Sequence, residues 1–320
     1  MNILITSAGS RNKIVQYFKR EIKENGKVIA TDMSNLAPAI YDADKFYLVP
    51  RIDHKDYIET LLDICKKEKI DCIFALIDPE LSLIAKNKNK FLEIGATPLI
   101  SNYNAVELAF NKYEMYKYLT KKNVKTPKTY IDKKEFYNDL DNSKIKFPVF
   151  VKPVTGSASI NISKVNSQEE IELLFSLYDD LIIQEYMDGQ EIGADVYIDP
   201  ISKKVVSIFT KEKIKMRAGE TDKSRSFKDE KLFNLITTTV EEIGYEYMID
   251  MDIFKINNEY YISEINPRFG GGYPHAYESG VNFPELIINS INGIENKNEI
   301  GHYEENIYMM KYNEIKIVKE

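Results

Sequence analysis

The chain has 320 residues, 43% of them hydrophobic, and its 50 acidic and 43 basic side chains give a formal net charge of −7. Single hydrophobic cores stop growing near about 250 to 300 residues, so this length predicts more than one domain. The acidic balance argues against nucleic acid or an anionic membrane as the main partner, so any anion-binding site must be local.

Cysteine and histidine are too scarce for several common kinds of site. The two cysteines, Cys65 and Cys72, argue against a disulfide framework or a zinc site and fit a reducing, cytoplasmic location. No apolar run approaches the roughly 18 residues of a membrane span, so we expect neither a signal peptide nor a transmembrane helix. With three scattered histidines, the chemistry is expected to use Lys, Arg, Asp and Glu.

Residues 1–105 predict a doubly wound parallel sheet, because strand and helix signals alternate along them. Gly9 follows the first strand and Asp32 ends the second, which leaves a dinucleotide site as an alternative. A single glycine in place of a G-x-G-x-x-G run favours a plain tight turn instead. The expected strands are 2–6, 28–32 and 72–77, and the expected helices include 13–25 and 54–69.

Residues 106–182 have a different order of helix and strand signals from residues 1–105, and they predict a small α+β unit. Its expected elements are a helix over 105–122, a helix over 133–140, and strands over 147–153 and 160–165. Residues 183–320 predict a largely antiparallel sheet with helices on one face. Its expected elements are strands over 182–187, 191–199 and 203–216, a hairpin over 247–267, helices over 229–244 and 283–292, and a last strand with a polar tail within 304–318.

A lysine leaves the strand over 147–153 and precedes a turn of small residues. The backbone N–H groups and hydroxyls of Gly156, Ser157, Ala158 and Ser159 can cover a polyphosphate while the Lys152 ammonium neutralises it. The segment is not a P-loop, because the glycine and lysine spacing is absent and no helix follows. Taken alone, an ordinary hairpin turn with an exposed lysine is the commoner interpretation.

The next extended segment suits an adenosine. Exposed backbone groups beside Met187 suit the edge and face of an adenine, and Glu191 can accept from both ribose hydroxyls. The alternative is a plain strand followed by a solvated acidic turn. The candidate adenine residues are Gln184, Glu185, Tyr186 and Met187.

Oxygen ligands for a hard cation are expected on the hairpin over 247–267. Alternation places Glu264 and Asn266 on one strand face, and Asp252 lies on the other arm. A three-residue loop at 257–259 would set Asp252 opposite Glu264, whereas a two-residue loop would put them on opposite faces. Asp250 shares the face of Asp252 and is a reserve candidate for the cation site, although an exposed carboxylate is the favoured interpretation.

Guanidinium groups supply the remaining anion contacts. Pro267 stops the strand, and Arg268 then presents a fork suited to a phosphate. The basic run around Lys215 is interpreted as a solvated face, but Arg217, at the start of a loop expected to be mobile, is a candidate for a phosphoryl group or a substrate carboxylate. Further substrate candidates are Gly9, Arg11, Gly271, Gly272, Tyr273 and His275. For His275, the sequence favours a structural role and a catalytic role equally.

In this order the motifs resemble the ATP-grasp superfamily, in particular the carboxylate–amine ligases and the large subunit of carbamoyl phosphate synthase. The most specific motif is Glu264-Ile265-Asn266-Pro267-Arg268, supported by the two segments that begin at Lys152 and Gln184. The resemblance spans essentially the whole chain. It implies an ATP-grasp fold with a Rossmann-like domain over 1–105, a small subdomain over 106–182, and a C-terminal subdomain with the metal site over 183–320.

The resemblance also implies roles for single residues. Lys112 and Lys152 would contact the phosphates, and Arg268 would stabilise the transferring phosphoryl group. Asp252, whose position is often Glu or Gln in relatives, would join Glu264 and Asn266 in holding two Mg²⁺ ions, with Mn²⁺ as a replacement.

The expected function is Mg-ATP-dependent ligation of a small-molecule carboxylate to an amine through an acyl phosphate. One alternative is carboxylase or carbamoyl-phosphate-synthase-like chemistry on bicarbonate. Another is a non-catalytic nucleotide-binding module. A homodimer is expected from the resemblance alone.

Overall fold

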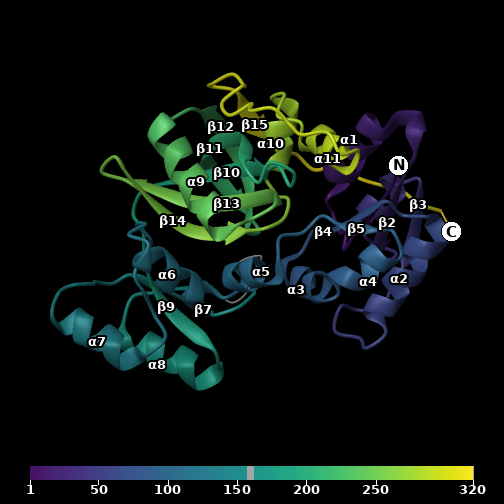
Figure 1. The fold of residues 1–320 in the computed structure, drawn as a ribbon. Helices are drawn as coiled ribbons and strands as arrows, with labels where there is room; N and C mark the ends of the chain where they lie inside the picture. The colour runs from purple at the N-terminus through teal and green to yellow at the C-terminus, as the bar shows by residue number, and fades with distance from the viewer. Residues whose placement is uncertain (157–161, 320) are drawn as a thin grey trace.

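Three β-sheets organise the chain, and helices cover them (Figure 1). The structure is a computed structural model, and it describes residues 1–156 and 162–319. Figure 1 shows the sheet of the N-terminal part at one side, a small unit with α7 and α8 at the other, and the largest sheet above them. Across the described ranges, no helix has both the length and the apolar character needed to cross a membrane.

The first sheet is parallel throughout and has the strand order β3-β2-β1-β4-β5. Its strands are apolar on both faces, as the parallel arrangement requires: Ile3 packs into one buried cluster and Leu4 into the other. The expected doubly wound sheet is therefore confirmed. Its elements are β1 (Asn2–Thr6), α1 (Asn12–Ile22), β2 (Lys27–Asp32), β3 (Lys45–Leu48), α2 (Tyr57–Glu68), β4 (Cys72–Ala75), α3 (Asp78–Lys86), α4 (Lys88–Glu93) and β5 (Thr97–Pro98), with short 3₁₀ turns at Lys23–Asn25 and Pro38–Asp42.

The turn after β1 is closed by a carboxylate. Asp32 accepts from the backbone N–H of Gly9 at 2.8 Å and from that of Ser34 at 3.0 Å. A bound pyrophosphate would need such backbone donors, and Asp32 already occupies them. The structure therefore agrees with a plain tight turn rather than a dinucleotide site.

Two helices lead from the first sheet to the small unit, where the sequence predicted one. The break falls at Asn111, whose side chain accepts from the backbone N–H groups of Tyr113 and Glu114 at 3.1 and 3.0 Å. This N-cap starts a new helix with Lys112 as its first residue. The two helices are α5 (Tyr103–Phe110) and α6 (Lys112–Lys121).

The small unit contains an antiparallel sheet of order β6-β9-β7-β8, covered by two helices. Residues 181–185 pair with β6 and β7, so residues 183–185, which were expected in the C-terminal sheet, belong to the sheet of the small unit. An apolar strand is compatible with either sheet, and pairing decides between them. The elements are β6 (Thr129–Tyr130), α7 (Lys133–Asp141), β7 (Val149–Pro153), β8 (Ser163–Val165), α8 (Gln168–Leu177) and β9 (Leu181–Glu185).

The third sheet is antiparallel and has the order β14-β13-β10-β11-β12-β15. The sequence predicted a mobile loop after Arg217. The structure instead has a tight turn at Ala218 and Gly219, both with positive φ, followed by a further strand. The elements are β10 (Gln190–Ile198), β11 (Val205–Arg217), β12 (Glu220–Phe227), α9 (Glu230–Ile243), β13 (Tyr247–Ile256), β14 (Glu259–Asn266), α10 (Tyr273–Glu278), α11 (Phe283–Ile291) and β15 (Tyr308–Met310).

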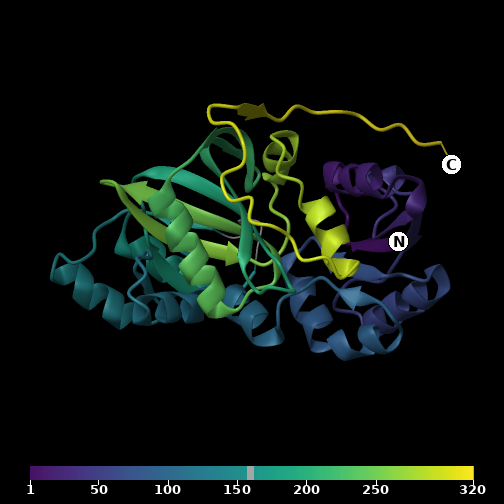
Figure 2. The ribbon, with the colours of Figure 1, turned by 45° about the horizontal axis from the view of Figure 1, so that its top comes forward.

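The segment after β15 runs back to the first sheet (Figure 2). Lys311 pairs with Glu220 at 2.8 Å, and Lys316 pairs with Asp42. The last described residues thus connect the edge of the third sheet to the N-terminal part of the chain.

Candidate active site

A cleft of about 960 Å³, including its open mouth, lies where the three sheets meet. Every unit contributes charged side chains to its wall. This convergence brings together residues more than 250 positions apart in the chain. The polar lining residues are Arg11, Asp78, Lys112, Lys152, Thr155, Lys213, Glu220, Thr221, Asp250, Asp252, Glu264, Asn266 and Arg268, with Gly156, Gly219, Gly271 and Gly272 between them.

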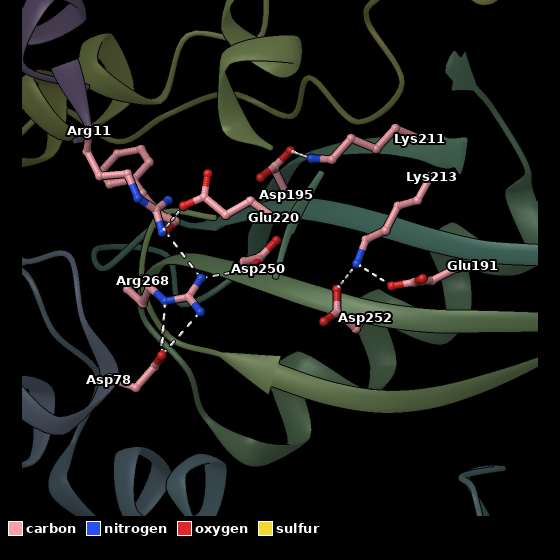
Figure 3. A network of polar contacts seen from close by, with 11 residues as sticks. Arg11, Asp78, Glu191, Asp195, Lys211, Lys213, Glu220, Asp250, Asp252 and Arg268 are labelled. Carbon is pink, nitrogen blue, oxygen red and sulfur yellow. Dashed lines mark hydrogen bonds and ion pairs between the residues drawn. The ribbon is translucent and has the colours of Figure 1, made fainter. Parts of the chain in front are cut away.

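One face of the third sheet carries charges with a period of two residues. The lysines of β11 form ion pairs with carboxylates of β10 and β13: Lys211 with Asp195, and Lys213 with Glu191 and Asp252 (Figure 3). Gly193, between Glu191 and Asp195 on β10, leaves room for the two lysine side chains. An added Cβ there would lie 3.0 Å from Lys211 Cε and 3.2 Å from Lys213 Cε. The ladder consists of Glu191 and Asp195 on β10, Lys211 and Lys213 on β11, Asp250 and Asp252 on β13, and Glu264 and Asn266 on β14.

Asp252 lies opposite Glu264, as predicted, but by a different route. The hairpin has a two-residue loop, in which Ile256 pairs with Glu259 and both central asparagines have positive φ. The predicted three-residue loop was therefore wrong. A β-bulge at Ser263 supplies the missing residue, because Ile253 pairs with Ile262 and Asp252 with Glu264.

The oxygen donors on this hairpin fit a hard cation. Asp252 and Glu264 face each other across paired strands, and the amide of Asn266 lies on the same face. Carboxylate and amide oxygens are ligands that Mg²⁺ accepts, with phosphate and water completing the shell. Within the described residues, no group of three or more His, Cys, Asp or Glu could hold an ion without such help.

Lys152 and Lys112 approach this donor set from the small unit and from α6. Lys152 is 6% exposed, and Lys112 donates to the carbonyl of Gly156 at 2.7 Å. Burial lowers the pKa of Lys152, and nearby Glu264 partly offsets this. Burial likewise raises the pKa of Glu264, against the attraction of Lys152 and Lys112. An anion beside Lys152 and a cation beside Glu264 would each stabilise the charged form that burial disfavours.

Arg268 is held in place by two carboxylates. Its guanidinium lies 3.2 Å from Asp78, at the start of α3, and 3.0 Å from Asp250 on β13 (Figure 3). Asp250 was expected to be an exposed carboxylate, but its side chain is only 15% exposed because it forms this pair. Because two carboxylates already fix its guanidinium, Arg268 can bind a third anion without losing further side-chain conformational entropy.

The glycine run over 270–272 allows the closest contacts. An added Cβ would lie 2.3 Å from Asp250 at Gly270, 2.7 Å from Glu220 at Gly271 and 2.7 Å from Lys211 at Gly272. These clashes explain why residues 270–272 are all glycines.

Two lysines that the sequence placed in a solvated run are buried. Lys211 bonds to Asp195, and Lys213 Nζ lies 2.8 Å from Glu191 and also bonds to Asp252. Lys215 is exposed, as expected. Charges of both signs with period two in adjacent strands were the signal that could have identified the buried pair.

The candidate adenosine residues lie outside the lining of this cleft among the described residues. Gln184 is buried and donates to Thr129 at 2.9 Å. Glu185 accepts from the backbone N–H of Lys128 at 3.0 Å. Glu191 reaches the cleft only through Lys213, while Tyr186 lies beneath the Lys164 ammonium and Met187 is 6% exposed. Three of the predicted phosphate-loop residues, Ser157, Ala158 and Ser159, lie outside the described residues.

Several substrate candidates do not line the cleft in the described part of the chain. Gly9 binds Asp32, and Arg217 points to the surface, where it pairs with Asp222 at 3.1 Å. Tyr273 donates to a backbone carbonyl within the core, and His275 is 2% exposed. Met216 and Ala218, beside Arg217, and Gly272, beside Tyr273, do line the cleft. Arg11, Gly271 and Gly272 do line it.

Comparison with known proteins agrees with this geometry. The model of the ATP-grasp domain matches residues 109–272, and that of the PylC-like N-terminal domain matches residues 3–100. A tyramine–L-glutamate ligase of Methanocaldococcus fervens is 29% identical over 79% of this chain and 77% of its own. A D-alanine–D-alanine ligase of Natranaerobius thermophilus is 24% identical over 89% of each chain.

Solved structures show the same fold. The biotin carboxylase domain of Hydrogenobacter thermophilus 2-oxoglutarate carboxylase, solved with MgADP, ADP and bicarbonate, covers 96% of this chain with 73% of its own, at a TM-score of 0.78 and 18% identity. Staphylococcus aureus N5-carboxyaminoimidazole synthetase with ADP covers 93% of this chain with 78% of its own, at a TM-score of 0.73 and 17% identity.

The fold and the charged cleft define an ATP-dependent ligase. The chain belongs to the ATP-grasp family, whose domain model alone spans more than half of it. The expected class, an ATP-grasp carboxylate–amine ligase, is confirmed by the relatives.

Proposed function

We propose that this ligase transfers the γ-phosphoryl group of ATP to a substrate carboxylate and joins the resulting acyl group to an amine. The observation that carries the proposal is the pairing of Lys112 and Lys152 with a facing set of oxygen donors, Asp252, Glu264 and Asn266. Lysines suit a triphosphate, and oxygen donors suit its divalent cation.

Atoms balance in two steps. A carboxylate oxygen attacks the γ-phosphorus and displaces ADP, which leaves an acyl phosphate. The amine nitrogen then attacks the acyl carbon, inorganic phosphate leaves, and the nitrogen loses a proton. Magnesium, when bound, neutralises charge on the phosphates; we propose two ions, held by Asp252, Glu264 and Asn266.

The side chains of the cleft act mainly by electrostatics and position. Lys112 and Lys152 neutralise the phosphate chain, and Arg268, fixed by Asp78 and Asp250, meets the transferring group. We also propose that residues 184–187 bind adenine and that Glu191 binds the ribose hydroxyls. Closure of the small unit over the nucleotide would bring residues 184–187 to the cleft. Domain limits near 105 and 185 and a homodimer are further proposals.

The test is a screen for ADP release with carboxylic acids paired with amines, begun with amino acids because the relatives' names contain them. We expect one pair to release ADP and to yield a product whose mass is that of acid plus amine minus water. Lys152→Met should abolish the signal, whereas Lys146→Met, which changes an exposed lysine just before the same strand, should not.

Two outcomes would contradict the proposal. ADP release with bicarbonate and no amine would indicate carboxylase-like or carbamoyl-phosphate chemistry. ATP binding with no acyl phosphate trapped by hydroxylamine, across the whole set of acids, would indicate a non-catalytic module.

A further inference from the structure

The last part of the chain that the structure describes carries exposed apolar side chains. We call residues 312–319 the C-terminal segment, and Figure 2 shows it as an extended trace that runs from β15 back towards the N-terminal part. Ile315 and Ile317 are 89% and 86% exposed, more than any other large hydrophobic side chain among the described residues, and Tyr312 is 76% exposed. Apolar side chains gathered on the surface in this way indicate an interaction site.

The backbone of the C-terminal segment is also unpaired. Lys311 donates its backbone N–H to the carbonyl of Asp222 at 2.9 Å, and beyond it no backbone group of the segment bonds to another described residue. A side chain holds the segment instead, because Lys316 pairs with Asp42. An extended segment with free N–H and C=O groups can pair with a further strand.

The side chains of the segment lie on two faces, because successive residues of an extended chain point in opposite directions. Lys316 faces the first sheet, to which its ammonium binds. Tyr312 and Glu314 share its face, and the Tyr312 hydroxyl donates to Glu314 at 2.8 Å. Ile315 and Ile317 therefore face away from the molecule, in agreement with their exposure.

A second copy of the chain fits the order of these residues. Two identical neighbouring strands related by a two-fold axis run antiparallel, so each residue lies opposite a residue of the other copy. Opposed side chains point to the same face of a sheet. Because alternate residues change face, the axis must pass through a residue and not between two residues.

An axis at Ile315 brings opposite charges together. It sets Glu314 opposite Lys316 of the partner subunit, twice by symmetry, and it sets the two Ile315 side chains opposite each other. An axis at Glu314 or at Lys316 would instead oppose like charges, and an axis at Ile317 would set Lys316 opposite an apolar Val318. Opposed pairs of unlike charge stabilise antiparallel strands, whereas like charges destabilise them.

We propose that the C-terminal segments of two copies pair as antiparallel strands about a two-fold axis at Ile315 and so form a homodimer. This inference rests on the homodimer of the proposed function, for which it names the interface, and it requires no catalytic step. Two such short strands bury less surface than a standard interface of about 1,600 Å², so we expect a weak dimer that dissociates on dilution.

Ile315→Cys tests the position of the axis. Opposed residues of antiparallel strands have Cα atoms about 4.5 to 5.5 Å apart, which a disulfide can span. Mild oxidation should convert this variant to a disulfide-linked dimer, seen at twice the chain mass on a non-reducing gel. Leu173→Cys, on α8 and 58% exposed, is the matched control and should stay monomeric on that gel. The native Cys65 and Cys72 are buried and do not compete.

Glu314→Lys tests the register. It opposes two lysines at each of the two symmetric positions, and sedimentation velocity over a range of concentrations should show a dissociation constant raised about tenfold. Glu295→Lys, which makes the same charge change at an exposed position after α11, should leave the constant unchanged. A chain that ends at Lys311 should sediment as a monomer throughout.

Equal cross-linking of Ile315→Cys and Leu173→Cys would overturn the inference. A dimer that persists unchanged in the chain ending at Lys311 would overturn this interface and leave the homodimer standing. Wild-type protein that is monomeric at every concentration would overturn both. None of these measurements uses ADP release, so failure of the ligase proposal would be a separate result.

Discussion

Glu264 and Lys152 show how single residues prepare this site. Both are buried, and burial moves the pKa of each toward its neutral form, upward for Glu264 and downward for Lys152. Each partly supports the charge of the other. The free protein thus keeps two poorly solvated charges that a bound nucleotide and its cation would stabilise.

Replacing Glu264 tests the cation site. Glu264→Gln should lower the rate of ADP release about 10²- to 10³-fold, as expected when one preorganised electrostatic contact is lost. The change in the thermal midpoint should be small, because the amide removes one poorly solvated charge while Lys152 loses the support of that charge. Glu259→Gln is the control, since Glu259 begins the same strand and its side chain is 43% exposed. Near-native ADP release by Glu264→Gln would contradict the metal assignment.

His275 makes the stability of the fold depend on pH. Its Nδ1 lies 2.8 Å from Ser224 Oγ and its Nε2 3.1 Å from the carbonyl of Ile307, which one neutral tautomer satisfies. Burial, with Lys211 nearby, lowers the pKa of His275 to about 4. Below pH 6.5 the unfolded chain binds a proton that the folded chain does not, so stability is lost as the pH falls toward 4.

The expected loss is up to about 3 kcal/mol in the free energy of unfolding. Urea unfolding of wild type and His275→Gln at several pH values measures it, and the variant should lose less stability between pH 6.5 and 4. His54→Gln, at an exposed position, is the control. Parallel curves for wild type and His275→Gln would refute the assignment.

At the scale of elements, the ladder on the third sheet depends on strand register. A bulge at Ser263 and a two-residue turn together keep Asp252 opposite Glu264. Lys213 then lies between Asp252 and Glu191. Burial alone would lower the pKa of Lys213, but Asp252 and Glu191 outweigh it and raise that pKa.

Removing this lysine should destabilise the sheet. Lys213→Met leaves Asp252 and Glu191 without their cation, and because both carboxylates are about 30% exposed we expect a cost of only about 1 to 3 kcal/mol. Chemical denaturation measures it. Lys215→Met, two positions further along β11 and exposed, should be neutral. Equal stability of the two variants would show that the ladder contributes nothing.

At the scale of the whole molecule, the cleft has walls from all three sheets. A ligand that contacts all of them binds only the folded chain and therefore raises its stability. ATP with magnesium at one hundred times its dissociation constant should add about 2.7 kcal/mol and raise Tm by several degrees.

A thermal melt checks this expectation. ATP with EDTA should give a smaller shift than ATP with magnesium, and Lys152→Met should reduce both shifts. Identical shifts with and without the metal would speak against a shared nucleotide and cation site.

The sequence alone predicted the fold class and most of the residues that we propose for the phosphate end of the cleft. Alternating apolar strands and helices predicted the first sheet, because a parallel sheet must bury both faces. The motif from Glu264 to Arg268 predicted oxygen donors followed by a guanidinium. These signals are local, so a short stretch of chain contains them.

Only the tertiary structure decided which distant charges meet. Asp78 reaches Arg268, Arg11 reaches Glu220, and Lys213 joins Asp252 to Glu191, each across elements far apart in the chain. Packing also buries Lys211 and Lys213, which the sequence placed in a solvated run. Side-chain direction depends on register and packing between elements, and these long-range constraints leave no local signature in the sequence.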